Sequence, residues 1–243
     1  MNRRLRGNIV VVIAALLAAA CRPGDPGARS VEGECVVLLH GLARTSLSME
    51  IMAWSLEEAG FTVANIDYPS RDHPIEALAP MAVETGIDEC RENDAQVIHF
   101  VTHSLGAILV RYYFTDHELA TLGRVVMLGP PNQGSNAADA FRDVPGFDWF
   151  GGEAGLQLGK GDDSVPRRLG APGFEFGVIA GNRSIDPVTS QVLENPDDGK
   201  VSVSDTRLEG MQDFRVVGAS HAFMMQDAEV IGLAIRFLQT GAF

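Results

Sequence analysis

Short apolar runs, separated by segments with helical spacing, constrain the fold of this chain more than any other feature. The runs are CVVLLH (35–40), FTVANIDYP (61–69), AQVIHFV (95–101), GRVVMLGPP (123–131), FEFGVIAG (174–181) and DFRVVGA (213–219). Helix-like segments lie at 48–60, at 74–92, directly after 104 and at 228–239. Continuous apolar strands that alternate with helices form a parallel sheet covered on both faces, so we predict a doubly wound, mostly parallel α/β fold.

The N-terminus has the pattern of an export signal. Basic MNRRLRG precedes apolar NIVVVIAALLAAA and then Cys21, which predicts a signal peptide over 1–20, a linker over 21–34 and one globular domain over 35–243. LLAAAC resembles a lipobox, in which Cys21 is lipidated, although Ala18 replaces the usual Leu. Ala18 and Ala20 also fit the A-x-A rule of ordinary cleavage. Both alternatives predict export. The protein would then be periplasmic, anchored in the outer membrane as a lipoprotein, or secreted into the medium.

The charge and the cysteines narrow the expected partners. A net charge of −13 repels phosphate backbones. It argues against binding to nucleic acid and against attachment to anionic lipid through a polybasic segment. Apart from Cys21, Cys35 and Cys90 form an even pair, so an oxidising compartment predicts a disulfide; two buried thiols are the alternative. No Cys-x-x-Cys and no His spacing indicates a metal site.

Ser104 lies where an apolar strand turns into a helix, in IHFVTHSLGAILVRYYF (98–114). Such a turn holds a serine hydroxyl above the sheet, and Gly106 provides the small downstream residue that a close backbone return requires. Thr102 stands where the pattern G-x-S-x-G has its first glycine, so the turn must open slightly or place the threonine side chain outward. The alternative is a simple helix N-cap at Ser104.

A serine nucleophile needs an imidazole base, which in this architecture follows it along the chain. Only His117 and His221 come later. His117 lies a few helical turns past Ser104 and away from the strand ends, whereas His221 follows the last strand in VVGASHAFMM. His221 is therefore the expected base.

The acid that orients this base should lie in the loop after 174–181. The loop contains four carboxylates, at Asp186, Glu194, Asp197 and Asp198. NPDDGKVSV places two of them before a glycine, in a tight turn that could aim one inward. We expect Asp198, directly before Gly199, to be the acid, with Asp197 as the alternative.

A carbonyl under attack also requires hydrogen-bond donors for its oxyanion. The amide of Leu105, at the start of the helix, is one expected donor. The second is the amide of Leu42, in the loop LLHGLARTS after the first strand, where Gly41 lets the chain double back.

The motifs VVLLHGLART, VTHSLGAILVRY, LGPPNQGS, DDGKVSV and GASHAFM together resemble the α/β-hydrolase fold, specifically small bacterial serine lipases and esterases. The resemblance covers most of the chain from about residue 35. It implies Ser104 as nucleophile, Asp198 as acid, His221 as base, and Leu42 and Leu105 as oxyanion donors. It also implies that no metal or organic cofactor is used.

These residues predict a carboxylic ester hydrolase that acts on a small-molecule ester or a lipid through an acyl-enzyme. The same residues could serve an acyltransferase or a thioesterase, and a pseudoenzyme that binds lipid or a partner at the envelope is the non-catalytic alternative. One segment interrupts the alternation: residues 131–172, rich in Gly, Asp and Pro, which form either a lid or a surface loop.

Overall fold

The computed structural model describes residues 31–141 and 147–243. Its centre is a six-stranded sheet in the order β2-β1-β3-β4-β5-β6, in which every pairing is parallel. The strands are β1 (Glu34–Leu39), β2 (Thr62–Ile66), β3 (Val97–His103), β4 (Leu122–Leu128), β5 (Phe176–Gly181) and β6 (Asp213–Val217). The prediction of a doubly wound parallel sheet is confirmed, and each expected run overlaps one strand.

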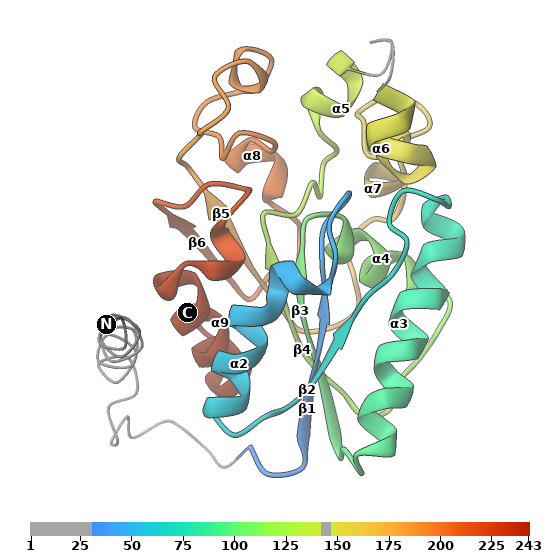
Figure 1. The fold of residues 1–243 in the computed structure, drawn as a ribbon, viewed down its shortest axis with the longest axis vertical. Helices are drawn as coiled ribbons and strands as arrows, with labels where there is room; N and C mark the ends of the chain where they lie inside the picture. Colours follow the sequence, from blue (N-terminus) through green and yellow to red (C-terminus); the bar gives the residue numbers. More distant parts are fainter. Residues whose placement is uncertain (1–30, 142–146) are drawn as a thin grey trace, which may run out of the picture.

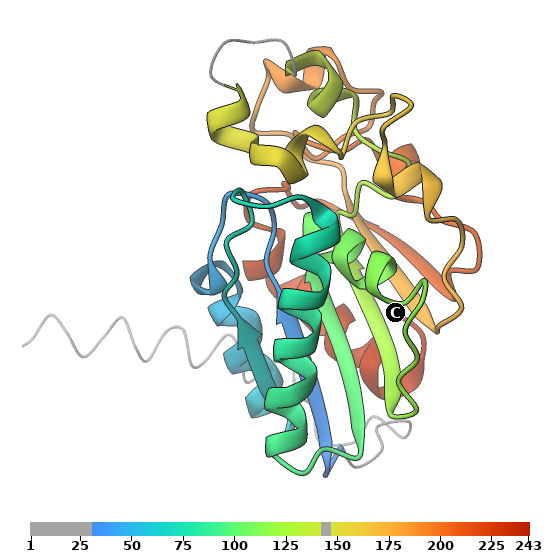
Figure 2. The ribbon, with the colours of Figure 1, turned by 90° about the vertical axis from the view of Figure 1, so that its right-hand side faces the viewer.

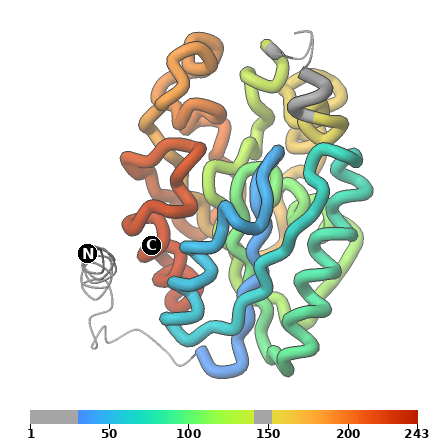
Figure 3. Tube along the Cα trace, viewed as in Figure 1, coloured from blue at the N-terminus to red at the C-terminus, as the bar shows by residue number. Residues whose placement is uncertain are grey.

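Helices cover both faces of this sheet (Figure 1). The α-helices are α2 (Glu50–Glu58), α3 (Ile75–Glu92), α4 (Leu105–Tyr113), α5 (Asn136–Phe141), α6 (Phe147–Leu156), α7 (Val165–Arg168), α8 (Val203–Thr206) and α9 (Ala228–Thr240). The 3₁₀ helices are η1 (Ser46–Met49), η2 (Thr189–Gln191) and η3 (Met224–Gln226). The trace in Figure 3 shows α2 and the C-terminal helix on one side of the sheet and α3 on the other.

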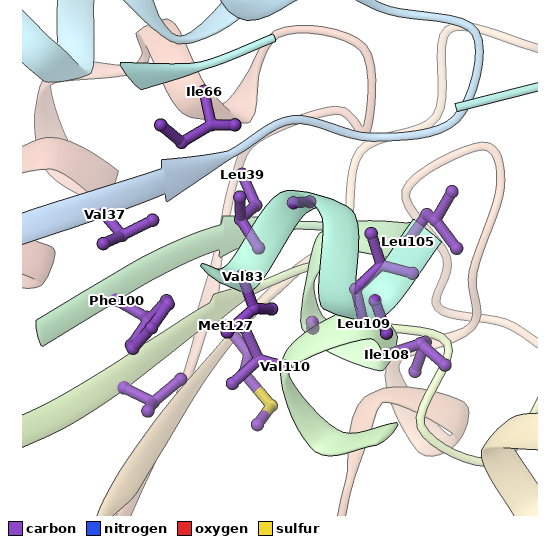
Figure 4. Close-up of a cluster of buried hydrophobic side chains, with 14 of the residues drawn as sticks. Val37, Leu39, Ile66, Val83, Phe100, Leu105, Ile108, Leu109, Val110 and Met127 are labelled. Carbon is purple, nitrogen blue, oxygen red and sulfur yellow. The ribbon is translucent and has the colours of Figure 1, made fainter. Parts of the chain in front are cut away.

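Successive residues of the central strands pack against opposite helix layers. In β1, Val36 and Leu38 belong to the core formed with α2 and α9, whereas Val37 and Leu39 belong to the core formed with α3 and α4. Figure 4 shows the second core, to which Phe100 of β3, Val83 of α3 and Val110 of α4 belong. Burial on both faces explains why the strands are continuously apolar rather than alternating with polar residues.

A disulfide joins Cys35 of β1 to Cys90 of α3, with the two Cα atoms 5.7 Å apart. Both cysteines are fully buried. The predicted pairing is confirmed, and it links the sheet covalently to the long helix on one of its faces.

The segment 131–172 contains the short helices α5, α6 and α7, which lie beyond the C-terminal edge of the sheet (Figure 2). Loops that follow the strands meet at the same edge. This is the edge at which ligands bind in open α/β sheets. Residues 142–146 lie outside the described part, so a lid remains a prediction.

The expected signal peptide, its cleavage site and Cys21 also lie outside the described residues. Within the described ranges, no helix has the length and apolar character needed to cross a membrane.

Candidate active site

Ser104 occupies a sharp turn between β3 and α4. Its backbone angles are φ 53° and ψ −115°, a combination that costs a non-glycine residue about 1–3 kcal/mol. The turn is held by the Ser104 amide, which donates to the carbonyl of Leu128 at 2.9 Å. The side chain of Ser104 makes no cap hydrogen bond to α4, so the helix-cap alternative does not account for this serine.

Gly106 permits the close return of the backbone after Ser104. A Cβ atom at this position would lie 2.6 Å from the carbonyl oxygen of Leu39, closer than real Cβ contacts come. Of the two arrangements expected for Thr102, the structure does not show the one with an outward side chain. Its side chain is fully buried rather than turned outward, and its hydroxyl donates to the carbonyl of Val126 on the neighbouring strand. The strand pairing therefore continues past the position where the pattern expects a glycine.

His221 and Asp198 form a buried pair. The Nδ1 atom of His221 lies 2.8 Å from Oδ2 of Asp198, which as a carboxylate can only accept. The proton of the neutral imidazole is therefore on Nδ1, and Nε2 carries the lone pair. The amide of His221 also donates to the carbonyl of Asp198 at 2.9 Å, so the backbones of the two loops are joined as well.

The turn that follows Asp198 orients its carboxylate. The amides of Lys200 and Val201 donate to Oδ1 at 2.9 and 2.8 Å, which leaves Oδ2 for His221. Asp197 faces elsewhere, since its Oδ1 accepts from the hydroxyl of Ser190 and the amide of Gly199, both at 2.7 Å. Asp198, and not Asp197, is thus the carboxylate in contact with the imidazole.

Two residues beside this pair were not identified from the sequence. His103 is buried next to Ser104, and its Nε2 donates to the carbonyl of His221 at 3.0 Å; the two rings lie 4.7 Å apart. Burial, with smaller contributions from nearby positive charge, holds the pKa of His103 well below its ordinary value. A neutral His103 therefore connects the serine turn to the loop that holds His221.

Gly129 is the second of these residues and lies directly against the Asp–His pair. A Cβ atom there would lie 3.1 Å from both Oδ2 of Asp198 and Nδ1 of His221. Its φ of +53° also favours glycine. The sequence shows a glycine directly after β4, in LGPP, but it does not show that this glycine packs against Asp198 and His221.

The loop after β1 approaches the serine turn closely. A Cβ atom on Gly41 would lie 2.6 Å from Nδ1 of His103 and 3.3 Å from Cβ of Ser104. Downstream, the amide of Ala43 donates to the hydroxyl of Ser70 at 3.0 Å, and Ala43 has a positive φ. The amide of Leu42, between these two positions, donates to no other residue in the described ranges.

The amide of Leu105 is likewise without an acceptor among the described residues, as expected for the first residue of a helix. Two N–H groups are therefore not used within the described fold, one on Leu42, which lines the same cavity as Ser104, and one on Leu105, which follows it.

His40 fixes the start of the same loop. Its ring stacks on Tyr68, with centroids 4.0 Å apart, and its Nδ1 bonds to the carbonyl of Gly41 at 2.9 Å. The hydroxyl of Tyr68 donates to the carbonyl of His40. Burial lowers the pKa of His40 and raises that of Tyr68, so both rings stay neutral near pH 7. His40 of the His-Gly dipeptide therefore has a structural role, because it packs against and bonds to Tyr68, 28 residues away.

Ser104 and His221 line one cavity of about 320 Å³. Its remaining walls are mainly apolar, and include Leu42, Pro131, Ala137, Ala138, Leu158 and Val201. Part of the wall comes from the segment 131–172. No direct hydrogen bond joins Ser104 to His221 within the described structure; catalytic hydrogen bonds are often long before a substrate binds.

His117, the other candidate base, lies away from this cavity. Its ring stacks on Tyr113 and bonds to Asp116, and its side chain is 44% exposed. In the described residues no group of three or more His, Cys, Asp or Glu side chains is arranged to hold a metal ion.

Several solved structures share this architecture. The mature lipase BlEst2 of Bacillus licheniformis matches with a TM-score of 0.70 at 19% identity, over 88% of this chain and 94% of that one. The phospholipase PlaB of Legionella pneumophila matches with a TM-score of 0.69 at 19% identity, over 86% of this chain but only 60% of its own length. An extracellular α/β-hydrolase from a Paenibacillus species has a TM-score of 0.53 at 13% identity, over 85% and 98% of the two chains.

By sequence, no family model and no curated protein matches the chain. Structural similarity at such low identity establishes the architecture alone. The order of the strands, their parallel pairing and these matches agree: the chain has the α/β-hydrolase fold.

Proposed function

We propose that the protein is a serine hydrolase of carboxylic esters. The observation that carries the proposal is the buried hydrogen bond between Asp198 and His221, which lines the same cavity as Ser104. A carboxylate, an imidazole of fixed tautomer and a serine on a strained turn are the components of nucleophilic acyl transfer. The named lipase and phospholipase of the same fold are consistent with this reaction.

In the first half-reaction, Oγ of Ser104 attacks the ester carbonyl while Nε2 of His221 takes the hydroxyl proton. The carbonyl oxygen becomes an anion beside the amides of Leu42 and Leu105. When the intermediate collapses, the bond to the alcohol oxygen breaks and His221 returns its proton to that oxygen. The alcohol leaves, and the acyl group stays on Ser104.

In the second half-reaction, a water molecule attacks the acyl carbon and gives a proton to His221. The bond to Ser104 then breaks, His221 reprotonates the serine, and the carboxylic acid leaves. Asp198 holds the imidazole in its tautomer throughout and stabilises the imidazolium ion.

The test is hydrolysis of p-nitrophenyl esters of rising acyl length by Ser104→Ala. We expect kcat to fall by more than about 10³-fold, because the nucleophile is lost. Ser55→Ala is the matched control, since Ser55 is a buried serine in α2 that bonds to the carbonyl of Ile51. Full activity in folded Ser104→Ala, or no hydrolysis by the wild-type protein, would contradict the proposal.

We further propose that the signal over 1–20 exports the protein and that Cys21 becomes a lipidated N-terminus. The disulfide between Cys35 and Cys90 is compatible with an oxidising compartment. Metabolic labelling with a fatty acid should mark the wild-type protein and not Cys21→Ser. Equal labelling of both proteins, or of neither, would remove the lipidation proposal.

A further inference from the structure

A second hollow adjoins the cavity of Ser104. It has a volume of about 580 Å³ and shares Ala43 and Arg44 with the cavity. Its other walls are mainly polar, and include Thr45, Ser48, Asp67, Ser70, Arg71 and Asp72. An apolar chamber and a polar chamber thus meet at Arg44.

Arg44 is tethered beside the proposed base. Its Nη2 donates to the carbonyl of Ala222 at 3.0 Å, and Ala222 directly follows His221. The side chain forms no ion pair with any residue in the described ranges, and this is its one hydrogen bond there. Arg44 is half-buried, and this burial lowers the pKa of its guanidinium. A partly desolvated guanidinium with unused donors is suited to bind an anion.

The other charged side chains near this junction are paired or exposed. Lys200 lines the apolar cavity, but its ammonium bonds to Asp186 at 2.8 Å. Asp67 uses Oδ1 to accept the amide of Ser46 and is 65% exposed, and Arg71 and Asp72 lie on the exposed rim of the hollow. Arg44 is therefore the half-buried cation that lines both chambers, on a chain whose net charge of −13 otherwise disfavours anions.

We infer that Arg44 binds an anionic group, a phosphate or a carboxylate, on the alcohol portion of the ester substrate. The inference rests on the proposed function and specifies its substrate class. The base delivers its proton to the departing alcohol, so the alcohol lies on the side of His221, where Arg44 is fixed through Ala222. The acyl chain then occupies the apolar cavity, and the alcohol extends into the polar hollow.

The experiment compares butanoate release from three soluble esters with one acyl group. They are 1-butanoylglycerol, which is neutral, 1-butanoylglycerol 3-phosphate and 3-butanoyloxypropanoate. For each protein, kcat/KM of either anionic ester is divided by kcat/KM of the neutral ester, so general damage to the catalytic residues cancels. We expect Arg44→Gln to lower at least one ratio by about 10- to 100-fold, as loss of a charged hydrogen bond implies. Arg44→Lys should lose less.

Arg236→Gln is the matched control, because Arg236 is an exposed residue of α9 and its loss changes the net charge equally. Its ratios should equal those of the wild type. The phosphate and carboxylate ratios identify which anion is bound. If both ratios are unchanged in Arg44→Gln, or fall equally in Arg236→Gln, the inference is wrong although the esterase proposal stands. If the wild type hydrolyses none of these esters or the p-nitrophenyl esters, the proposed function itself fails.

Discussion

Replacing Gly41 by alanine probes the proposed oxyanion loop through one methyl group. The added Cβ atom would lie 2.6 Å from Nδ1 of His103, whereas ordinary contacts begin near 3.4 Å. His103 cannot retreat easily, because it is fully buried and its Nε2 bonds to the carbonyl of His221. The loop must therefore move by roughly 1 Å, a displacement large enough to lose an aligned catalytic group.

The amide of Leu42 follows Gly41 and would move with it. An oxyanion donor acts at about 2.7–3.1 Å, and loss of one costs about 2.7–4 kcal/mol, equivalent to about 10²- to 10³-fold in kcat. We expect Gly41→Ala to show this fall in kcat on p-nitrophenyl butanoate with little change in KM. Urea unfolding of the same samples establishes that the variant is folded.

Gly232→Ala in α9 is the matched control. No atom lies within 4 Å of a Cβ built on Gly232, so alanine fits there. This control should keep wild-type kcat and gain up to about 1 kcal/mol of stability. A folded Gly41→Ala protein with wild-type kcat would refute the assignment of the Leu42 amide to the oxyanion.

Three further changes test other parts of the account. Asp198→Asn should lower kcat by about 10⁴-fold, because the imidazole loses its correct tautomer. Asp197→Asn should lower kcat far less, and the reverse order would make Asp197 the acid. Replacing Cys35 and Cys90 together by serine should lower the free energy of unfolding in urea by about 4 kcal/mol, from a crosslink spanning 55 residues, with kcat retained; an unchanged unfolding midpoint would contradict this. Burial keeps folded His103 neutral while the unfolded chain protonates below about pH 6.5, so its contribution is lost as pH falls below that value, by up to about 1.4 kcal/mol per pH unit. Urea unfolding from pH 7.5 to 5.5 should show a smaller loss for His103→Gln, and equal losses would count against a buried neutral ring.

The parallel sheet and the positions of Ser104 and His221 could be predicted from the sequence, because these features depend on neighbouring residues and on the order of the chain. The apolar runs indicated buried strands, and the serine at a strand-helix junction indicated a sharp turn. Asp198 was preferred to Asp197 because it precedes Gly199, and the structure shows which one contacts the imidazole.

Contacts between distant segments could not be predicted in the same way. His103 and Gly129 matter through their packing against His221, and each comes from a different strand end. From local sterics alone, we expected either that the turn opens slightly or that the Thr102 side chain turns outward. In the structure β3 continues to His103, and a carbonyl of β4 accepts the threonine hydroxyl. A hydrogen bond to the neighbouring strand therefore determines where the Thr102 side chain lies, and nothing within the motif itself indicated that bond.

Covalent labelling with an alkyl organophosphonate tests most directly whether the side chains of Ser104, His221 and Asp198 act together. The reagent should phosphonylate the wild-type protein once, and mass spectrometry of the digested protein should place the adduct on Ser104. His221→Ala should remain folded and react far more slowly, because the hydroxyl then has no base to take its proton. An adduct on another residue, or equal labelling rates in wild type and His221→Ala, would contradict a serine activated by this imidazole.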